Sequence, residues 1–279
     1  WGFVDFNRPM VAINQWEQAE DSTYTLCGKD RIHPSTDGHL VMAYLFLKAQ
    51  GLAGKPVADI RIDGAGKKVT RSDNCRVSDL SVSSDNLTFT YEAKSLPYPI
   101  DTSYYDNEKH TQADALSVIP FMDEMNYEGL SVSGLSDGYY GLTIGGEFIG
   151  RFTARELERG INMALLQNTP QYKQAMKIRQ MNEERWLKER KMREFYWVEY
   201  NLMRKTGMLW ACNEAAVDTL RKYRPHDIFL QWNGDLWLQY MHKGIREDCV
   251  NEQQDLVNQI YEQNKPIPLR IEIKKFTDL

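Results

Sequence analysis

The stretch of residues 169–206 constrains the fold of this chain more than any other part of the sequence. Thr169-Pro170 places an N-cap residue directly before a proline at the first helical position, so a long helix is predicted to run to about Thr206. Ten basic and five acidic side chains lie between residues 173 and 205. Large side chains interrupt these charges at Met176, Trp186, Phe195 and Tyr196. The pattern indicates a helix with a charged face exposed to solvent and an apolar face packed against the protein, rather than a helix that binds nucleic acid or a membrane.

The sequence around this helix predicts a helical C-terminal region over residues 151–279. Thr153-Ala-Arg-Glu156 is a capping-box pattern that opens a helix. Further helices are predicted over about 213–223 and 246–263. The tail, residues 268–276, alternates between polar and apolar side chains like an edge strand.

Residues 54–150 have a different residue pattern, which predicts a β-rich accessory domain. Short β-like runs, such as 57–62 and 87–91, are separated by clusters of Gly, Asn, Asp and Ser. The stretch 130–149 is predicted to form a three-stranded meander, with Asp137-Gly138 and Gly145-Gly146 at its tight turns.

Residues 1–53 are predicted to form the end of an α/β unit. A strand over 2–6 is followed by a helix that opens near Pro9, a loop over 21–36 and a helix over 37–50 that ends at Gly51. The first residue is Trp1 and no turn or cap precedes the strand, so the chain is expected to begin inside a domain. Any signal peptide or lipid anchor would lie upstream.

Composition narrows the possible partners. With 39 acidic and 34 basic residues the net charge is −5, which gives no electrostatic reason to expect nucleic acid as a partner. No apolar run approaches the roughly 20 residues that span a bilayer. The cysteines lie too far apart for a zinc site or a redox motif and are predicted to be free thiols: Cys27, Cys75, Cys212 and Cys249.

The motif with the most chemical content is Asp30-Arg-Ile-His33-Pro34. A carboxylate three residues before a histidine in a tight loop can accept a hydrogen bond from the imidazole Nδ1, which fixes the tautomer and leaves Nε2 free to take a proton. Pro34 restricts the backbone of His33 and stiffens the loop.

This motif and its surroundings resemble the last conserved block of the SGNH/GDSL hydrolases. In that family an Asp-x-x-His-Pro loop precedes the final helix of a flavodoxin-like α/β/α domain, and its Asp and His complete a catalytic triad. The resemblance implies that Asp30 and His33 are catalytic and that residues 1–53 are the C-terminal portion of such a domain. The resemblance also includes the flanking residues, Phe3-Val-Asp-Phe-Asn7 upstream and Asp37-Gly-His-Leu-Val-Met-Ala-Tyr44 downstream of the loop.

The resemblance continues along most of the chain, with one large departure. Some multidomain members, many from carbohydrate-degrading bacteria, have a tail similar to residues 135–144, 152–157 and 160–164 and to Thr169-Pro170. The family's Gly-Asp-Ser nucleophile block and its two oxyanion-hole blocks come before the Asp-x-x-His-Pro loop, and none is present here. The resemblance therefore implies that the serine is supplied upstream of Trp1.

A second catalytic candidate lies at Ser136, because Gly134-Leu-Ser136-Asp-Gly138 matches the G-x-S-x-G pattern of α/β-hydrolases. That elbow needs a helix directly after the sharp turn. The following residues, 139–144, look like a strand. Ser136 is therefore predicted to lie in a hairpin turn, where Ser, Asp and Gly are common.

The other histidines are given structural interpretations. His39 is expected to cap a helix or lie in the core. His110, with Asp106 and Asp114 at helical spacing, is a possible metal cluster, but an exposed polar loop explains all three. His226 follows Pro225 at a predicted helix end, and His242 falls in a Trp-rich stretch that is expected to be core.

The sequence thus predicts a serine-dependent carboxylic ester hydrolase that needs no metal or organic cofactor. Its substrate would be a small-molecule or carbohydrate ester, and family resemblance places it outside the cytoplasm, in the periplasm or secreted. The alternative is a non-catalytic accessory or carbohydrate-binding module, in which Asp30 and His33 are only loop residues. A helical interaction protein built on residues 170–206 would need a heptad repeat that the sequence does not contain. The acyl group, the alcohol and the oligomeric state are not determined by the sequence.

Overall fold

The chain is a mixed α/β protein that divides into two compact units. The structure, a computed structural model, describes residues 2–103 and 110–276. Unit 1 comprises residues 1–175 and 265–279, and unit 2 comprises residues 176–264. Helix α5 (Pro170–Val198) begins in unit 1 and continues into unit 2. Unit 2 has a hydrophobic core of its own, so it buries apolar side chains independently of unit 1.

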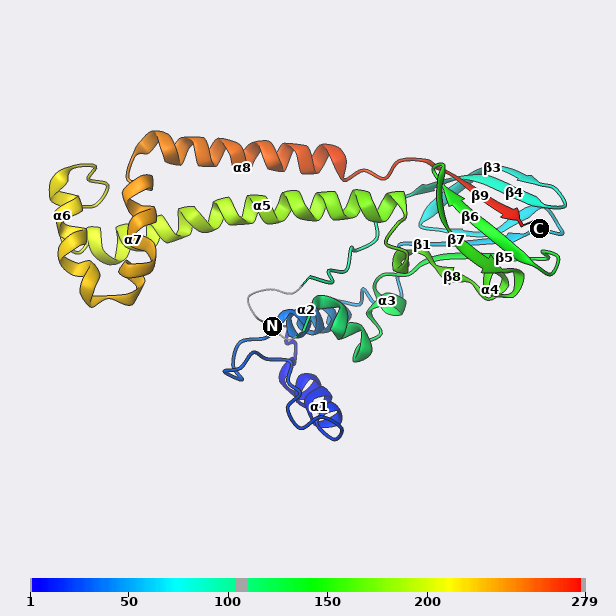
Figure 1. Ribbon diagram of the computed structural model, residues 1–279, viewed down its shortest axis with the longest axis horizontal. Coiled ribbons are helices and arrows are strands. Elements are labelled where there is room, and N and C mark those ends of the chain that lie inside the picture. Colours follow the sequence, from blue (N-terminus) through cyan, green and yellow to red (C-terminus); the bar gives the residue numbers. More distant parts are fainter. Residues whose placement is uncertain (1, 104–109, 277–279) are drawn as a thin grey trace. The chain divides into compact units, whose positions relative to one another are not determined.

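Two β-sheets form the largest part of unit 1 (Figure 1). The four-stranded sheet has the order β2-β1-β5-β8 and consists of β1 (Ala58–Asp63), β2 (Lys68–Asp73), β5 (Glu128–Ser133) and β8 (Ile161–Asn162). The five-stranded sheet has the order β3-β4-β9-β6-β7 and consists of β3 (Cys75–Val82), β4 (Asn86–Ala93), β6 (Tyr139–Ile144), β7 (Glu147–Thr153) and β9 (Leu269–Lys275). Neighbouring strands are antiparallel except β1 and β5, which are parallel.

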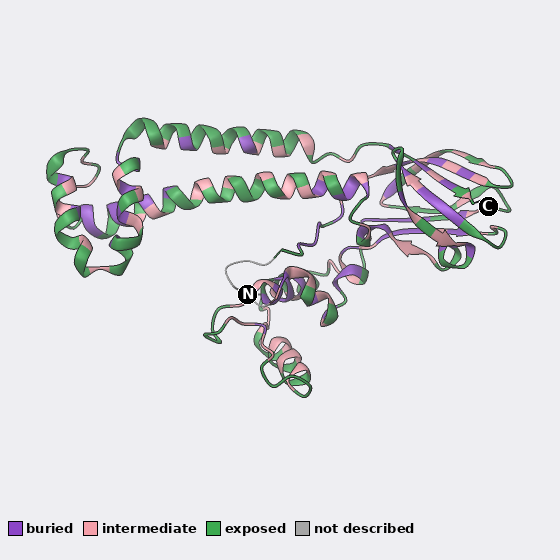
Figure 2. Ribbon diagram, in the orientation of Figure 1, coloured by how far each residue is buried: buried purple, intermediate pink, exposed green. Residues whose placement is uncertain are grey.

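The two sheets bury their apolar side chains in one shared core. Side chains alternate between faces along a strand, so every second residue of β4 points inward. Figure 2 shows this alternation of buried and more exposed residues along the strands. The core includes Ile60 and Leu130 from one sheet and Phe89, Leu142 and Ile271 from the other. The unit is therefore a sandwich of two sheets.

The predicted three-stranded meander is wrong in its pairing. β6 and β7 form the predicted hairpin, and the turn between them holds Gly145 at φ 59° and Gly146 at φ 87°. These left-handed values suit glycine and the tight turn. β5, however, belongs to the four-stranded sheet, where it pairs with β1 and β8. Asp137-Gly138 therefore lies in a connection between the two sheets, not in a hairpin.

The C-terminal strand also departs from its prediction, because β9 is not an edge strand. It lies in the middle of the five-stranded sheet and pairs with β4 on one side and β6 on the other (Figure 1). Leu269, Ile271 and Ile273 are buried in the sandwich core. The expected domain boundary at residue 150 lies inside β7, and β9 returns the chain to unit 1.

The segment that contains Asp30 and His33 connects helices α1 (Asn7–Glu17) and α2 (Thr36–Ala49) of unit 1. The unit also contains α3 (Phe121–Glu124), α4 (Ala154–Arg159) and the short 3₁₀ turns η1 (Gln112–Ser117) and η2 (Met163–Leu165). α2 packs on η1 and α3 through a core that includes Leu40, Tyr44 and Phe121. It is followed by Gly51 at φ 71°, close to the predicted end.

The helix start at Thr153 is confirmed, and the strand over 2–6 is wrong. The Thr153 hydroxyl accepts the Glu156 N–H at 3.1 Å, and the Glu156 carboxylate accepts the Thr153 N–H at 2.7 Å, which completes the capping box. Residues 2–6 form no strand, because within the described part of the chain no strand lies beside them to hydrogen-bond their backbone N–H and C=O groups. Within the described part of the chain, residues 2–53 contribute helices and a loop.

Unit 2 is entirely helical. α5 passes into a π-helical segment, η3 (Glu199–Met203), and α6 (Glu214–Tyr223), the turn η4 (Arg224–His226), α7 (Ile228–Tyr240) and α8 (Lys243–Gln263) follow. The predicted helices over 213–223 and 246–263 are confirmed, whereas α7 was not predicted. Its Trp237 is fully buried with Phe195 and Leu220. α8 is mostly exposed and buries Cys249 and Leu256 (Figure 2).

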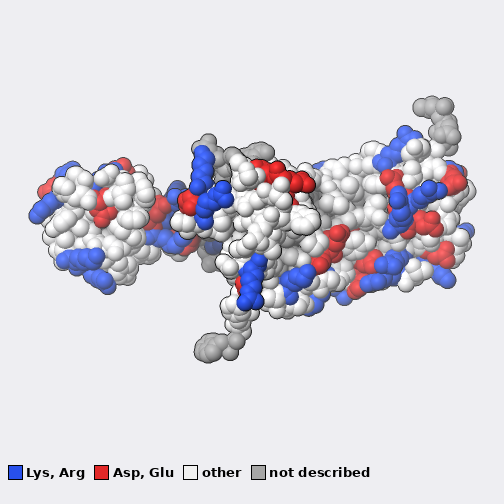
Figure 3. Space-filling view, turned by 90° about the horizontal axis from the view of Figure 1, so that it is seen from below, with Lys and Arg blue, Asp and Glu red and all other residues white. Residues whose placement is uncertain are grey.

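The surface carries charges of both signs. Figure 3 shows basic and acidic side chains interspersed on the face that it presents, without one large patch of either sign. Among the described residues, no helix is both long enough and apolar enough to cross a bilayer.

Candidate active site

The loop that carries Asp30 and His33 is closed by backbone contacts. A single β-bridge pairs Cys27 with Pro34, and the Gly28 N–H donates to the His33 carbonyl at 2.8 Å. At the tip, Arg31 has a left-handed φ of 60°, which is unfavourable for a residue with a Cβ. Such backbone strain is concentrated at functional sites in proteins. The closed loop fixes the positions from which Asp30 and His33 project.

Asp30 and His33 form a carboxylate–imidazole pair. Their Oδ2 and Nδ1 atoms lie 2.6 Å apart, within the predicted reach of a hydrogen bond. The other carboxylate oxygen accepts the N–H groups of Ile32 at 2.9 Å and of His33 at 3.1 Å. Arg31, the cation that could have competed for this carboxylate, is not among its partners. The aspartate is thus held by three hydrogen bonds within one turn of chain.

These contacts define the protonation of the pair. The hydrogen bond with His33, and then the N–H groups of Ile32 and His33, lower the pKa of Asp30 to about 2. Asp30 is therefore ionised at neutral pH, and Nδ1 of His33 carries the proton that the two groups share. In the neutral ring Nε2 is then unprotonated, which is the form of a general base.

The second nitrogen of His33 is open to solvent. The His33 side chain is 83% exposed, and among the described residues no donor or acceptor contacts Nε2. No serine, threonine or cysteine hydroxyl or thiol in that part of the chain is bonded to it. The pair therefore has the orientation of a triad base but lacks a nucleophile within the described residues.

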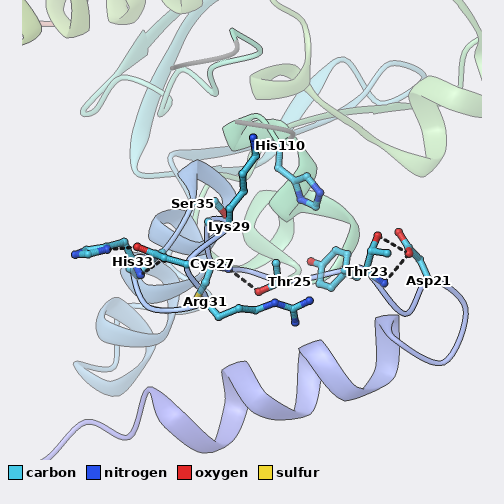
Figure 4. A pocket seen from close by; sticks show the side chains of 13 residues that line it. Asp21, Thr23, Thr25, Cys27, Lys29, Arg31, His33, Ser35 and His110 are labelled. Carbon is cyan, nitrogen blue, oxygen red and sulfur yellow. Dashed lines mark hydrogen bonds and ion pairs between the residues drawn. The ribbon is translucent and has the colours of Figure 1, made fainter. Parts of the chain in front are cut away.

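A pocket of about 690 Å³ lies beside this pair (Figure 4). Its walls come from residues 21–35 together with His110, which lies far away in the sequence. They are rich in polar side chains, including Thr23, Thr25, Lys29 and Arg31. A pocket with these walls can hydrogen-bond a polar ligand.

The structure adds a second carboxylate–imidazole pair that the sequence did not predict. His110 Nδ1 lies 2.8 Å from Oδ2 of Asp37, whose side chain is 1% exposed. The Gly38 N–H at 2.8 Å and the Ser35 hydroxyl also donate to Asp37. The two partners are 73 residues apart, and no local pattern signals their contact.

Two members of the metal cluster considered around His110 have other partners in the described part of the chain: His110 contacts Asp37, and Asp114 contacts Thr111. Asp114 instead accepts the N–H of Thr111 at 2.5 Å and completes a capping box at η1. Asp106 lies outside the described residues. Within residues 2–103 and 110–276 no group of three His, Cys, Asp or Glu side chains is arranged to hold a metal ion.

Ser136 does not form a nucleophile elbow. Its hydroxyl accepts a hydrogen bond from Lys275 Nζ at 2.8 Å and lies 3.1 Å from the Tyr140 hydroxyl. Strand β6 follows it, whereas the elbow requires a helix. No histidine among the described residues contacts Ser136, and the residue lies in the connection between the two sheets rather than in the predicted hairpin turn.

The remaining histidines occupy local positions. His39 Nδ1 bonds the Ser35 carbonyl one turn earlier at 3.0 Å. His226 is exposed in η4. His242 is also exposed rather than in a core, and its Nδ1 lies 3.3 Å from Sγ of Cys212. All four cysteines are free thiols, as predicted.

Comparison with known proteins gives two matches. Residues 176–265 match the family model of the diltiazem deacetylase C-terminal helical domain. This matched range coincides with unit 2. The whole fold is similar to the solved structure of a gut microbial diltiazem-metabolizing enzyme, with a TM-score of 0.93 and 42% sequence identity. No curated protein matches the chain.

The similarity to the solved enzyme extends along nearly the whole chain but not along the whole enzyme. It covers 99% of this chain and 62% of the chain of that enzyme. Both matches are to proteins that transform the same small molecule, one of them by removing an acetyl group, as its name states. In sequence and fold, this chain is therefore similar to the larger part of a small-molecule-metabolizing enzyme.

Proposed function

We propose that this chain supplies the acid–base pair of a serine-dependent ester hydrolase of the SGNH/GDSL type. The observation that carries the proposal is the 2.6 Å contact between Asp30 and His33 beside a pocket of about 690 Å³. The similarity to a deacetylase domain and to a diltiazem-metabolizing enzyme supports hydrolysis of an acyl group. Because the chain spans 62% of the length of that enzyme, the nucleophilic serine is proposed to lie in a part of the full-length protein beyond these 279 residues.

In the proposed reaction, His33 Nε2 takes the proton of the serine hydroxyl as the serine oxygen attacks the ester carbonyl carbon. The tetrahedral intermediate then expels the alcohol oxygen, to which the imidazolium returns the proton. The acyl-serine is cleaved in the same way by a water molecule, which releases the carboxylic acid and restores the serine. Asp30 holds the Nδ1–H tautomer and stabilises the imidazolium in both steps.

The decisive experiment is His33→Ala in the full-length protein, assayed on 4-nitrophenyl acetate. Loss of the base is expected to lower kcat by at least about 10³-fold, because the members of a triad act as a unit. Asp30→Asn is expected to cost less, since it leaves the imidazole in place. His226→Ala, which removes an exposed histidine in unit 2, is the matched control and should leave turnover unchanged.

Circular dichroism of each variant establishes that the fold is retained. The Asp30–His33 loop lies on the surface and buries little, so the substitutions should not affect folding. Undiminished turnover by a folded His33→Ala protein would remove His33 from the mechanism. The accessory or carbohydrate-binding module would then be the better account of the chain.

A further inference from the structure

An exposed thiol and an exposed imidazole are paired in unit 2, whereas the candidate active site belongs to unit 1. Sγ of Cys212 lies 3.3 Å from Nδ1 of His242, although 30 residues separate the two along the chain. The proposed ester hydrolysis uses neither side chain. The fold therefore holds a nucleophilic group in contact with a basic group at a surface that solvent reaches.

Both members of the pair lie at the N-terminal ends of helices. Cys212 directly precedes Asn213, the N-cap residue of α6, and His242 is itself the N-cap residue of α8. The His242 side chain makes no capping hydrogen bond, so its Nδ1 contacts the thiol rather than the helix. The N-terminal end of a helix carries a partial positive charge, which favours negative charge on a nearby sulfur.

The other three cysteines lack this arrangement. Burial raises the pKa of Cys75 to about 11, which disfavours its thiolate. Cys249 is also buried, and its thiol donates to the Lys188 carbonyl at 3.6 Å. Cys27 is partly exposed, but no imidazole among the described residues contacts its sulfur. Within the described part of the chain, only the Cys212 thiol is both exposed and in contact with a base.

The contact favours the reactive form of this thiol whichever tautomer the imidazole adopts. The nucleophile in thiol chemistry is the thiolate. When the imidazole ring takes the thiol proton, both of its nitrogens carry hydrogen, so Nδ1–H of His242 donates to the negative sulfur. An imidazolium beside a thiolate stabilises it, as in other reactive cysteines.

We propose that Cys212 is a site of covalent modification by low-molecular-weight disulfides, with His242 as the residue that accepts its proton. This function lies beyond the proposed ester hydrolysis and does not depend on it. The Cys212 sulfur attacks one sulfur of the small disulfide, so that a new S–S bond forms and the S–S bond of the small disulfide breaks. The departing sulfur takes the proton from the imidazolium. The products are a mixed disulfide at Cys212 and one free thiol, and no further oxidant is required.

The test measures the rate of modification at each cysteine of the full-length protein with oxidised glutathione at neutral pH. Mass spectrometry of the digested protein follows the mixed disulfides at Cys212 and Cys27 in the same sample. Cys212 is expected to react faster than Cys27. His242→Ala should slow the reaction of Cys212 by about 10-fold, because an unassisted thiol is only a few per cent ionised at this pH. The rate at Cys27, which belongs to unit 1, should not change.

Two comparisons separate the role of the imidazole from simple exposure of the thiol. Lys243→Ala is the matched control: it removes the neighbouring cation, which pairs with Glu247, but keeps the imidazole, and should alter the rate at Cys212 by less than about twofold. His242→Ala also leaves more space around the sulfur. If exposure alone determines the rate, Cys212 should therefore react as fast in His242→Ala as in the wild type, or faster.

An unchanged or increased rate in His242→Ala overturns the proposal, as does a wild-type protein in which Cys212 forms no mixed disulfide with oxidised glutathione. Circular dichroism establishes that the helices of each variant are retained. Should His242→Ala not fold, His242→Gln, which keeps a polar side chain at this exposed position, is judged by the same ratio of the rates at Cys212 and Cys27.

Discussion

At the scale of single residues, Glu128 is a buried acid in the core of the sandwich. Its Oε1 accepts hydrogen bonds from the Tyr91 hydroxyl at 2.8 Å and from Gln171 Nε2 at 3.2 Å. Its Oε2 and the Gln171 side-chain oxygen are buried without a partner among the described residues. Burial raises the pKa of Glu128 to about 7 against the lowering effect of these two donors. The folded chain therefore binds a proton at Glu128 that the unfolded chain has already released.

The substitution Glu128→Gln tests whether the folded chain binds this proton. Because the folded pKa is raised from 4.5 to about 7, the wild-type free energy of unfolding is expected to fall as the pH rises between these values and to level off above them. The glutamine side chain of Glu128→Gln does not titrate, so the variant should not show this decrease in the free energy of unfolding. The gain in stability of Glu128→Gln over wild type should be about 3 kcal/mol larger at pH 8 than at pH 4.5. Urea unfolding at several pH values measures it, and a difference that does not change with pH would contradict the assignment.

At the scale of the elements, the π-helical segment η3 organises the core of unit 2. Its first residue, Glu199, is buried and accepts the Trp237 indole N–H at 2.8 Å through one oxygen. The other oxygen accepts the Trp210 backbone N–H at 2.8 Å. Trp210 has a left-handed φ of 63°, so the contact holds an unfavourable backbone conformation. A single carboxylate thus connects α5, α7 and the connection before α6.

Glu199→Ala should be strongly destabilising. It leaves two donors without an acceptor, one of them on the fully buried Trp237, and is expected to lower the free energy of unfolding by about 2 to 4 kcal/mol. Glu199→Gln keeps one acceptor and should cost less. Glu194→Ala is the matched control: it breaks an exposed pair with Arg190 on the same helix and should cost under about 0.5 kcal/mol. Equal losses for Glu199→Ala and Glu194→Ala in urea unfolding at pH 7 would show that the buried contact is unimportant.

At the scale of the whole molecule, the candidate site and the helical domain are in different units. Asp30, His33 and the pocket belong to unit 1, whereas the family match to a deacetylase domain covers unit 2. The two units have separate hydrophobic cores. The similarity to a deacetylase domain therefore concerns the helical unit, whereas the proposed chemistry depends on the loop in unit 1.

Purified residues 1–279 are expected to show no hydrolysis of 4-nitrophenyl acetate above the rate of scattered surface nucleophiles. The reason is that, among the described residues, no hydroxyl or thiol contacts His33 Nε2 and no histidine contacts Ser136. Any rate that is found is compared with those of His33→Ala and Ser136→Ala in the same 279 residues. Activity that depends on Ser136 would reverse the choice of catalytic centre.

The sequence by itself determined the features whose atoms are close along the chain. The capping box at Thr153 and the Thr169-Pro170 helix start formed as predicted, because these contacts are made within one turn. The Asp30–His33 contact was predictable for the same reason: three residues separate the partners. The β-like runs predicted over 57–62 and 87–91 coincide with most of β1 and β4, since the alternation of side chains along a strand depends only on the local backbone.

Only the tertiary structure decided the features made by distant segments. β9 reads as an edge strand by its alternation, yet β4 and β6 pair with both of its edges, because hydrogen bonding between strands leaves no trace in the sequence of one strand. A strand over 2–6 was predicted from apolar residues, but no neighbouring strand among the described residues completes it. His110 reaches Asp37 across 73 residues through the packing of α2 on η1. Local hydrogen bonds are thus specified by spacing, whereas pairing and pocket walls depend on which surfaces the folded chain brings together.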